Sequence, residues 1–196
     1  MPDVRRLARR YRAAPRGVVL ALLRSPWHEE RLLALLILVA QYGVADAAER
    51  DAICRTYLAH TRYVNNWDLV DASAPEILGA AEIALLERLA RSSSLWERRI
   101  AIMSTFASIR RARFGPTLRI ARILLRDPHD LIHKAAGWML REVGKRDRAR
   151  EEAFLRRHCR AMPRTMLRYA VEHFPEPRRK RYLRGEIAFP RVRPSR

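Results

Sequence analysis

Residues 63–75 read Tyr63-Val-Asn-Asn-Trp-Asp-Leu-Val-Asp-Ala-Ser-Ala-Pro75, and the interpretation of the whole chain starts from this stretch. Asn66 is a favourable N-cap residue, and Asp68 would lie in the first helical turn, where the helix dipole favours negative charge. The pattern therefore predicts a short helix over 66–72. Pro75 is expected to open the next helix, because proline is favoured in a first turn.

Trp67 and Asp71 are four residues apart, so a helix places them on one face. Leu69 and Val70 can then face the core. An indole ring offers π density and a carboxylate offers a full negative charge, and together they suit a site that holds a positive charge. The alternative is a tryptophan of the core beside a solvated or capping aspartate.

Nearly every other segment is also predicted to be helical, which makes the chain all-α. Only seven glycines occur in 196 residues, no alternating strand pattern is present, and proline and glycine fall between the apolar segments. Ser94-Leu-Trp-Glu97 has the form of a capping box. Further helices are expected near 16–24, 28–42, 46–61, 75–91, 95–112, 116–126, 129–146, 149–160 and 164–173.

Three segments resemble one another, at 22–33, 89–101 and 124–136. Each ends one helix in an apolar residue plus arginine, caps the next helix with serine or aspartate, and continues into an apolar run. Such repetition favours an α-solenoid, in which helix pairs bury their apolar faces by stacking on their neighbours. The competing interpretation is an irregular helical bundle.

The charge of the chain is extreme. Forty Lys and Arg stand against 21 Asp and Glu, a net charge of +19, which points to a polyanionic partner, nucleic acid before anionic membrane. The longest apolar run, 32–40, is too short to span a bilayer. Cys54 and Cys159 have no close partner, which fits a reducing compartment. No signal peptide is apparent, so we expect a cytoplasmic, nucleoid-associated protein.

Basic residues gather at two further places. Arg98 and Arg99 follow Trp96 in a predicted first turn, where cations oppose the helix dipole and an external anion would relieve them. The alternative is an ion pair, for instance with Glu97. A second cluster comprises Arg110, Arg111, Arg113, Arg119 and Arg122. With the high net charge of the chain, we interpret it as a stripe of side chains that contacts successive phosphates of a nucleic acid. The alternative is an ordinary solvated face.

Gly137 lies inside a strongly apolar predicted helix, where glycine costs about 1 kcal/mol relative to alanine. Close approach of another helix or of a ligand backbone would explain it. Trp138 and Arg141 are three residues apart on one face of this helix. Trp138 alone could equally be a core residue.

Metal and cofactor sites are not expected. His129 and His133 have the spacing of a zinc helix, but Asp130 stands where a metalloprotease needs glutamate, and no third ligand is evident. The chain has no glycine-rich nucleotide motif, P-loop or nucleophile pattern.

Three separated motifs resemble the AlkD-like DNA alkylation repair glycosylases, a family of HEAT-like helical repeat proteins. They are Asn-Asn-Trp-Asp-Leu-Val-Asp at 65–71, Trp-Glu-Arg-Arg-Ile-Ala-Ile at 96–102 and His-Lys-Ala-Ala-Gly-Trp-Met-Leu-Arg-Glu at 133–142. The resemblance implies a right-handed α-solenoid with a concave basic face, formed by one domain over 1–185. It also implies an N-terminal region that is short relative to the family. The composition of the last residues, which are rich in Lys and Arg and interrupted by Pro190 and Pro194, separately predicts a mobile basic tail over 186–196.

The resemblance further implies a monofunctional glycosylase that removes cationic N3- or N7-alkylpurines from double-stranded DNA as a monomer. Asp71 would stabilise the developing sugar cation, Trp67 and Trp138 would pack against sugar and backbone, and Arg99 would hold a phosphate. A non-catalytic repeat protein that binds damaged or branched DNA is the alternative, and a protein-binding scaffold is a third. Further DNA contacts are expected from Arg98, Arg110, Arg111, Arg113 and Arg141.

Overall fold

The computed structural model describes residues 2–187, and within this part every regular element is a helix. The predicted all-α class is therefore confirmed. The elements are α1 (Pro2–Arg10), α2 (Arg16–Leu23), α3 (His28–Val44), α4 (Ala47–Ala59), η1 (Thr61–Tyr63), α5 (Trp67–Ile77), α6 (Ile83–Ala90), α7 (Leu95–Ser104), α8 (Phe106–Arg110), α9 (Gly115–Ile123), η2 (Leu124–Arg126), α10 (Asp130–Gly144), α11 (Arg148–His158), α12 (Arg164–Ala170) and α13 (Glu176–Leu183).

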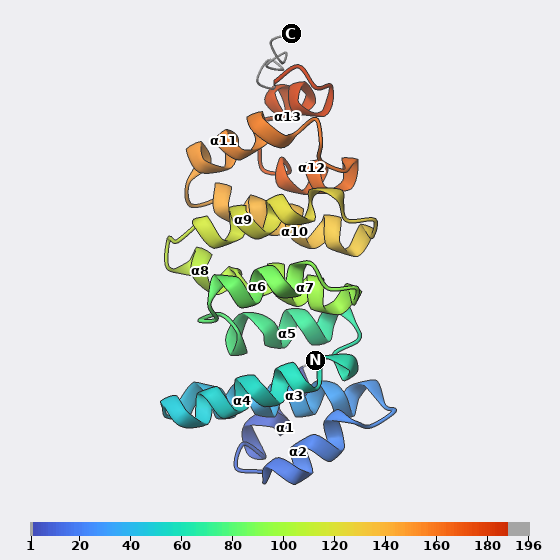
Figure 1. Ribbon diagram of the computed structural model, residues 1–196, viewed down its shortest axis with the longest axis vertical. Coiled ribbons are helices and arrows are strands. Elements are labelled where there is room, and N and C mark those ends of the chain that lie inside the picture. Colours follow the sequence, from blue (N-terminus) through green and yellow to red (C-terminus); the bar gives the residue numbers. More distant parts are fainter. Residues whose placement is uncertain (1, 188–196) are drawn as a thin grey trace. The chain divides into compact units, whose positions relative to one another are not determined.

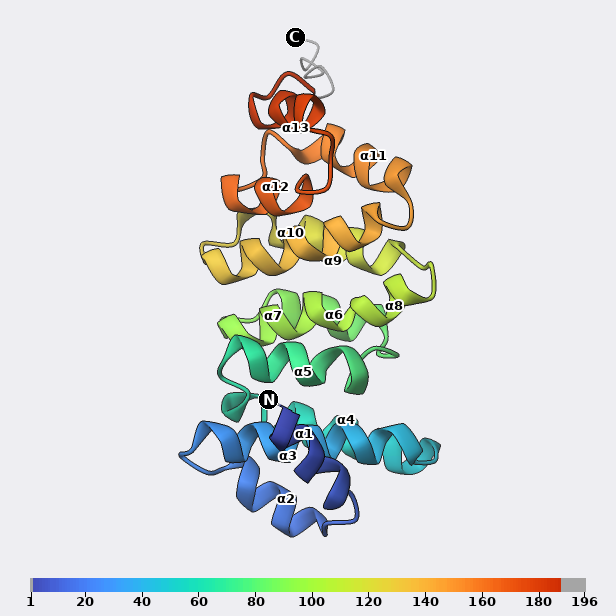
Figure 2. The same ribbon diagram turned by 180° about the vertical axis from the view of Figure 1, so that it is seen from behind.

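The chain forms two compact units, Met1–Ala107 and Ser108–Arg196. In the first unit α5 packs between α3 and α7, while α1 and α2 cover α3 (Figures 1 and 2). α4 packs against α3 and α5, and α6 packs against α7. The helix that carries Trp67 and Asp71 is thus held between two other helices of the same unit.

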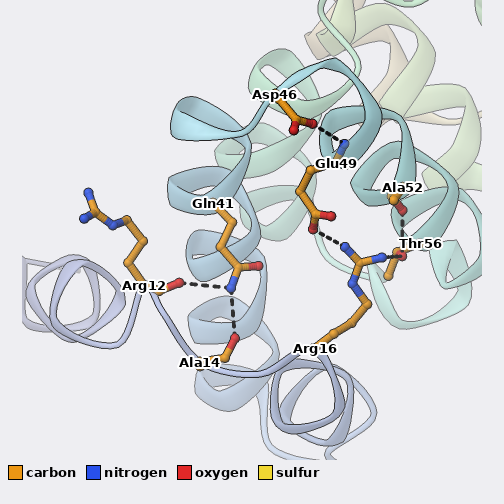
Figure 3. A network of polar contacts seen from close by, with 8 residues as sticks. All are labelled: Arg12, Ala14, Arg16, Gln41, Asp46, Glu49, Ala52 and Thr56. Carbon is orange, nitrogen blue, oxygen red and sulfur yellow. Dashed lines mark hydrogen bonds and ion pairs between the residues drawn. The ribbon is translucent and has the colours of Figure 1, made fainter.

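Polar bonds fix the start of the first unit (Figure 3). The Gln41 side chain in α3 donates to the backbone oxygens of Arg12 and Ala14, at 2.9 and 3.0 Å. Arg16 pairs with Glu49 of α4. These bonds hold the connection between α1 and α2 against α3 and α4, where carbonyl groups would otherwise lack partners.

The three similar segments share one hydrogen-bonded loop. In each, a side chain two residues before the N-cap accepts from the N-cap amide, as Ser25 does for Trp27 at 3.1 Å. The backbone oxygen of the same residue accepts from a side chain six residues later, as in the bond from Arg31 to Ser25. The other two copies pair Ser92 with Ser94 and Arg98, and Asp127 with His129 and His133. This shared loop shows that the weak sequence similarity marks a real structural repeat.

In the second unit α10 is central, because α9, α11 and α12 all pack on it. Gly137 lies where α10 meets α12. A Cβ atom there would come within 2.5 Å of the Met166 backbone oxygen and 2.6 Å of the Tyr169 Cβ. Close approach of another helix, one of the two explanations offered by the sequence, therefore accounts for this glycine.

The predicted boundaries failed around Pro75. The proline does not open a helix: it lies inside α5, and the next helix starts only at Ile83. Burial explains the difference, since Ala74 and Ile77 are fully buried and the packing of this face outweighs the hydrogen bond that proline removes. α5 then ends before Gly79, where a Cβ atom would lie 2.2 Å from the Pro75 oxygen.

The predicted helix over 95–112 is also interrupted, at Thr105, which separates α7 from α8. α8 then ends in a Schellman turn, in which Arg113 N bonds to Ser108 O and Ala112 N bonds to Ile109 O. Ala112 takes the left-handed conformation, with φ 56°, where glycine is usual. Because alanine stands where glycine would mark such a turn, the sequence alone did not show this end of α8.

Both ends of the chain contain helices that the sequence pattern did not predict, α1 and α13. Tyr182 in α13 is buried, and its ring packs edge-on against that of Phe174. The basic tail predicted over 186–196 lies outside the described residues from 188 onwards.

Candidate functional site

The start of α5 leaves Trp67 open and buries the residues beneath it. The Trp67 side chain is 54% exposed, whereas Leu69 and Val70 are fully buried, as predicted. Asn66 occupies the N-cap position, but its side chain makes no capping bond, contrary to expectation. Asp68 instead accepts from the amide of Leu69 at 2.9 Å. The first turn is therefore stabilised by its own aspartate.

Asp71 lies one turn after Trp67 and is paired with Arg99 of α7. Arg99 Nε donates to Asp71 Oδ1 at 2.9 Å, and Nη2 donates to Oδ2 at 2.7 Å. Both side chains are largely buried, with 15% of Asp71 and 6% of Arg99 exposed. Two parallel bonds of this kind fix the plane and position of the carboxylate. The packing of α5 on α7 thus brings together two residues that are 28 positions apart.

The ionisation of Asp71 is set by opposing effects. Burial raises the pKa of this carboxyl group, the hydrogen bonds and charge of Arg99 lower it, and the charge of Asp68 raises it slightly. The balance places the pKa of Asp71 above its ordinary value of 3.8. The hydrogen bonds and charge of Arg99 thus favour the charged form of Asp71 and oppose the effect of burial.

A second pair, which the sequence did not reveal, joins α3 to α5. His28 Nε2 lies 2.8 Å from Asp68 Oδ2, and both side chains are partly buried. The residues that precede them, Trp27 and Trp67, are the two most exposed tryptophans, at 68% and 54%. The pair therefore anchors the helix starts from which both indole rings project.

Glu97, the alternative partner considered for Arg98 and Arg99, is bonded elsewhere. Its carboxylate accepts from Thr61 Oγ1 at 2.8 Å, and its amide donates to the Ser94 hydroxyl at 3.5 Å. Only half of the predicted capping box is therefore present. Arg98 donates to the backbone oxygens of Ser92 and Ser93 at 3.0 and 2.9 Å, in the shared loop described above.

The other predicted DNA contacts lie in or near the second unit. Arg141 of α10 pairs with Glu172, and only 17% of its side chain is exposed. The arginines around the turn between α8 and α9 are exposed, namely Arg110, Arg111 and Arg113. Only the latter group presents its side chains openly to solvent.

Trp138 lies in α10 of the second unit and is half-buried. The Glu142 carboxylate, one turn later, is hydrogen-bonded by Lys145, Arg146 and Trp138, and these bonds outweigh burial and lower its pKa. The indole is thereby tied to an ionised carboxylate. The first unit by itself brings together Trp67, Asp71 and Arg99.

The two histidines with zinc-helix spacing have other partners. His129 Nδ1 accepts from the amide of Leu131 at 3.2 Å, and His133 Nε2 lies 2.6 Å from the Asp127 backbone oxygen. Across residues 2–187 no group of three or more His, Cys, Asp or Glu is arranged to hold a metal ion.

None of the described helices is long and apolar enough to cross a membrane. Among known families, the model of the DNA alkylation repair enzymes matches residues 1–174 of this sequence. The chain belongs to this family of DNA alkylation repair enzymes, as its three motifs predicted. Comparison with curated proteins and with solved structures gave no match.

Proposed function

We propose that the protein is a monofunctional DNA glycosylase that hydrolyses the N-glycosidic bond of cationic N3- and N7-alkylpurines in double-stranded DNA. The observation that carries the proposal is the buried Asp71–Arg99 pair one helical turn from the exposed ring of Trp67. Membership of the DNA alkylation repair enzymes supports the same substrate class.

Asp71 supplies the negative charge of the reaction. Alkylation makes the purine cationic and hence a good leaving group. As the bond between C1′ and nitrogen breaks, the deoxyribose gains oxocarbenium character, which a fixed carboxylate stabilises. Asp71 also helps to place the attacking water molecule. The alkylated purine leaves with the electron pair of the broken bond.

Arg99 acts on the reaction through Asp71. Its guanidinium is buried and forked onto the carboxylate, so we assign it a positioning role in place of the phosphate contact suggested by sequence. The fork holds Asp71 in one orientation and keeps it ionised against the effect of burial. A preorganised charge stabilises a transition state without the cost of reorientation.

The tryptophans contact sugar and backbone. The open face of Trp67 excludes water and offers π density to the sugar cation. Trp138, in the second unit, packs against the DNA backbone. We further propose that the helices form a right-handed solenoid of HEAT-like pairs with a concave basic face. DNA is then recognised through its backbone, with contacts from Arg98, Arg110, Arg111, Arg113 and Arg141.

The function is tested by measuring release of free 7-methylguanine and 3-methyladenine from methylated duplex DNA, under single turnover with protein in excess. The proposal predicts release well above the spontaneous rate. Release at the spontaneous rate by folded protein that is bound to the duplex would contradict it.

One observation favours a second candidate, a non-catalytic protein that binds damaged or branched DNA. Both oxygens of Asp71 accept from Arg99, and this pairing offsets part of the charge that catalysis needs. Tight binding of methylated duplex without base release would establish this candidate in place of the glycosylase.

A further inference from the structure

The second unit contains a strongly basic cavity that the proposed active site does not use. Its volume is about 580 Å³, and its lining residues come from α9 and α11. Both helices pack on α10 (Figure 1). The walls of the cavity carry four arginines and no carboxylate: Arg119 and Arg122 come from α9, and Arg150 and Arg157 from α11. The lining also includes apolar side chains, among them Phe154 and Leu118.

The spacing of the arginines along each helix places them on the face that lines the groove. Arg119 and Arg122 are three residues apart and share one face of α9. Arg150 and Arg157 are seven residues apart, so they lie two turns apart on one face of α11, about 10.5 Å along its axis. This row is long enough to contact more than one phosphate of a nucleic-acid strand. The cavity is therefore a groove between two arginine rows.

Three of the arginines that line this groove, Arg122, Arg150 and Arg157, have at most one distant carboxylate partner among the described residues. Among the described residues, no carboxylate pairs with Arg122 or Arg157, and Arg150 reaches its nearest carboxylate, Asp147, only at 3.9 Å. Since like charges repel, gathering guanidinium groups around one cavity costs stability unless an anion occupies it. Arginine also suits phosphate, because its planar fork donates two parallel bonds.

The pKa of His158 depends on the charges of the same arginines. It lines the groove and its ring packs against Phe154, with the ring centres 4.6 Å apart. Burial lowers the pKa of His158, and the charges of Arg122 and Arg157 lower it further. A phosphate bound between these arginines would reverse the latter effect and raise the pKa of His158.

We propose that the groove between α9 and α11 binds successive phosphates of a nucleic-acid strand, as a second contact separate from the site at Asp71. Arg122 and Arg157 on facing walls bind neighbouring phosphates, and Arg119 and Arg150 extend the two rows. The strong positive charge of the chain, +19, raises the local concentration of such a ligand.

The test follows the imidazole signals of His158 by NMR in the full chain, with His158→Gln used for assignment. The probe is single-stranded hexathymidylate, compared with inorganic phosphate at the same total phosphate concentration. We expect hexathymidylate to raise the pKa of His158 at concentrations at which inorganic phosphate leaves it unchanged, because several linked phosphates bind the arginine rows more tightly than one free anion. In Arg122→Ala/Arg157→Ala the pKa change is lost, and hexathymidylate binds roughly tenfold or more weakly at this site.

The matched control is Arg55→Ala/Arg91→Ala, which also removes two positive charges, from exposed positions in α4 and directly after α6 of the first unit. It should keep the response of His158. No response in the unmodified protein would overturn the proposal, and so would equal responses in both double variants. If inorganic phosphate raised the pKa of His158 as much as hexathymidylate does, the groove would be a site for free anions. That result would also overturn the proposal of strand binding. Base release is not needed for the readout, so failure here is distinguishable from failure of the glycosylase.

Discussion

Asp71 receives both of its hydrogen bonds from one guanidinium, and this single pairing determines how either residue can act. A buried ion pair is costly to break, because removing one partner leaves an uncompensated charge, at about 3–5 kcal/mol. A buried arginine that already forms two such bonds has little capacity to grip a phosphate as well. The position of the carboxylate is therefore the property that Arg99 controls.

Replacing Arg99 with lysine tests this role without deleting the charge. A lysine cannot donate the two parallel bonds, so the carboxylate loses its fixed position and base release should fall by about 100-fold. The dependence of DNA affinity on salt should stay unchanged, because no phosphate contact is lost. A slope reduced by about 0.9 in a plot of log affinity against log salt would instead show that Arg99 holds a phosphate.

Glu151 provides a pH test that is independent of DNA. The residue is 2% exposed, one carboxyl oxygen has no hydrogen-bond partner among the described residues, and burial raises the pKa of Glu151 to about 8. The folded protein holds this proton more tightly than the unfolded chain, whose ordinary value is 4.5. Stability from this group is therefore complete below about pH 4.5 and is lost as the pH rises to about 8.

Glu151→Gln should remove this pH dependence, because glutamine stays neutral. In urea unfolding at pH 9 we expect the variant to be more stable than the unmodified protein, by on the order of 3 kcal/mol. At pH 5 the two should nearly coincide. A variant that is less stable at pH 9 would show that the ionised carboxylate is favourable in the fold.

Sequence reasoning at the residue scale found the members of the site but not all their partners. Trp67 and Asp71 could be placed on one face because helical spacing is local. The pairing of Asp71 with Arg99, and of His28 with Asp68, joins residues 28 and 40 positions apart. Such contacts depend on which helices pack together, and periodicity in one segment holds no information about that.

At the scale of helices, Gly137 shows how packing can outweigh helix propensity. Gly137→Ala should destabilise the protein by about 1–3 kcal/mol although alanine is the better helix former, because its Cβ would meet the backbone of α12. Gly43→Ala is the matched control, since nothing lies within 4 Å of its Cβ position in α3. It should be neutral or stabilising by up to about 1 kcal/mol. Thermal unfolding of both variants checks the pair, and equal effects would contradict this account.

The sequence predicted the presence of helices more reliably than it predicted their boundaries. Apolar periodicity found α2, α3, α4 and α10 to within a few residues. Pro75 misled the prediction because burial of Ala74 and Ile77 carries α5 through the proline. The repeated loops were visible only as weak similarity, since Arg31 and Arg98 are replaced by His133 in the third copy. The conserved element is a bond to a backbone oxygen, which different side chains can make.

At the scale of the whole molecule, the three motifs fall into two compact units. Those at 65–71 and 96–102 belong to the first unit, and the one at 133–142 belongs to the second. Asp71 and Arg99, which positions its carboxylate, therefore both lie within the first unit. Their geometry should be insensitive to substitution of Trp138.

The net charge and the three motifs carried the functional prediction, and the family match over residues 1–174 supports its substrate class. The sequence predicted only two of the four arginines that line the groove between α9 and α11. Arg119 and Arg122 stood in a predicted basic cluster, whereas Arg150 and Arg157 join them only through the packing of both helices on α10.

The most direct test of the central claim is base release by Asp71→Asn, measured with duplex affinity on the same methylated DNA. Asparagine keeps the size of the side chain and removes the charge that would stabilise the sugar cation. We predict that release of 7-methylguanine falls by 100-fold or more, at about 2.7 kcal/mol of lost transition-state stabilisation, while affinity for the duplex is retained. Release and affinity that fall together, or release that does not change, would contradict a catalytic role for Asp71.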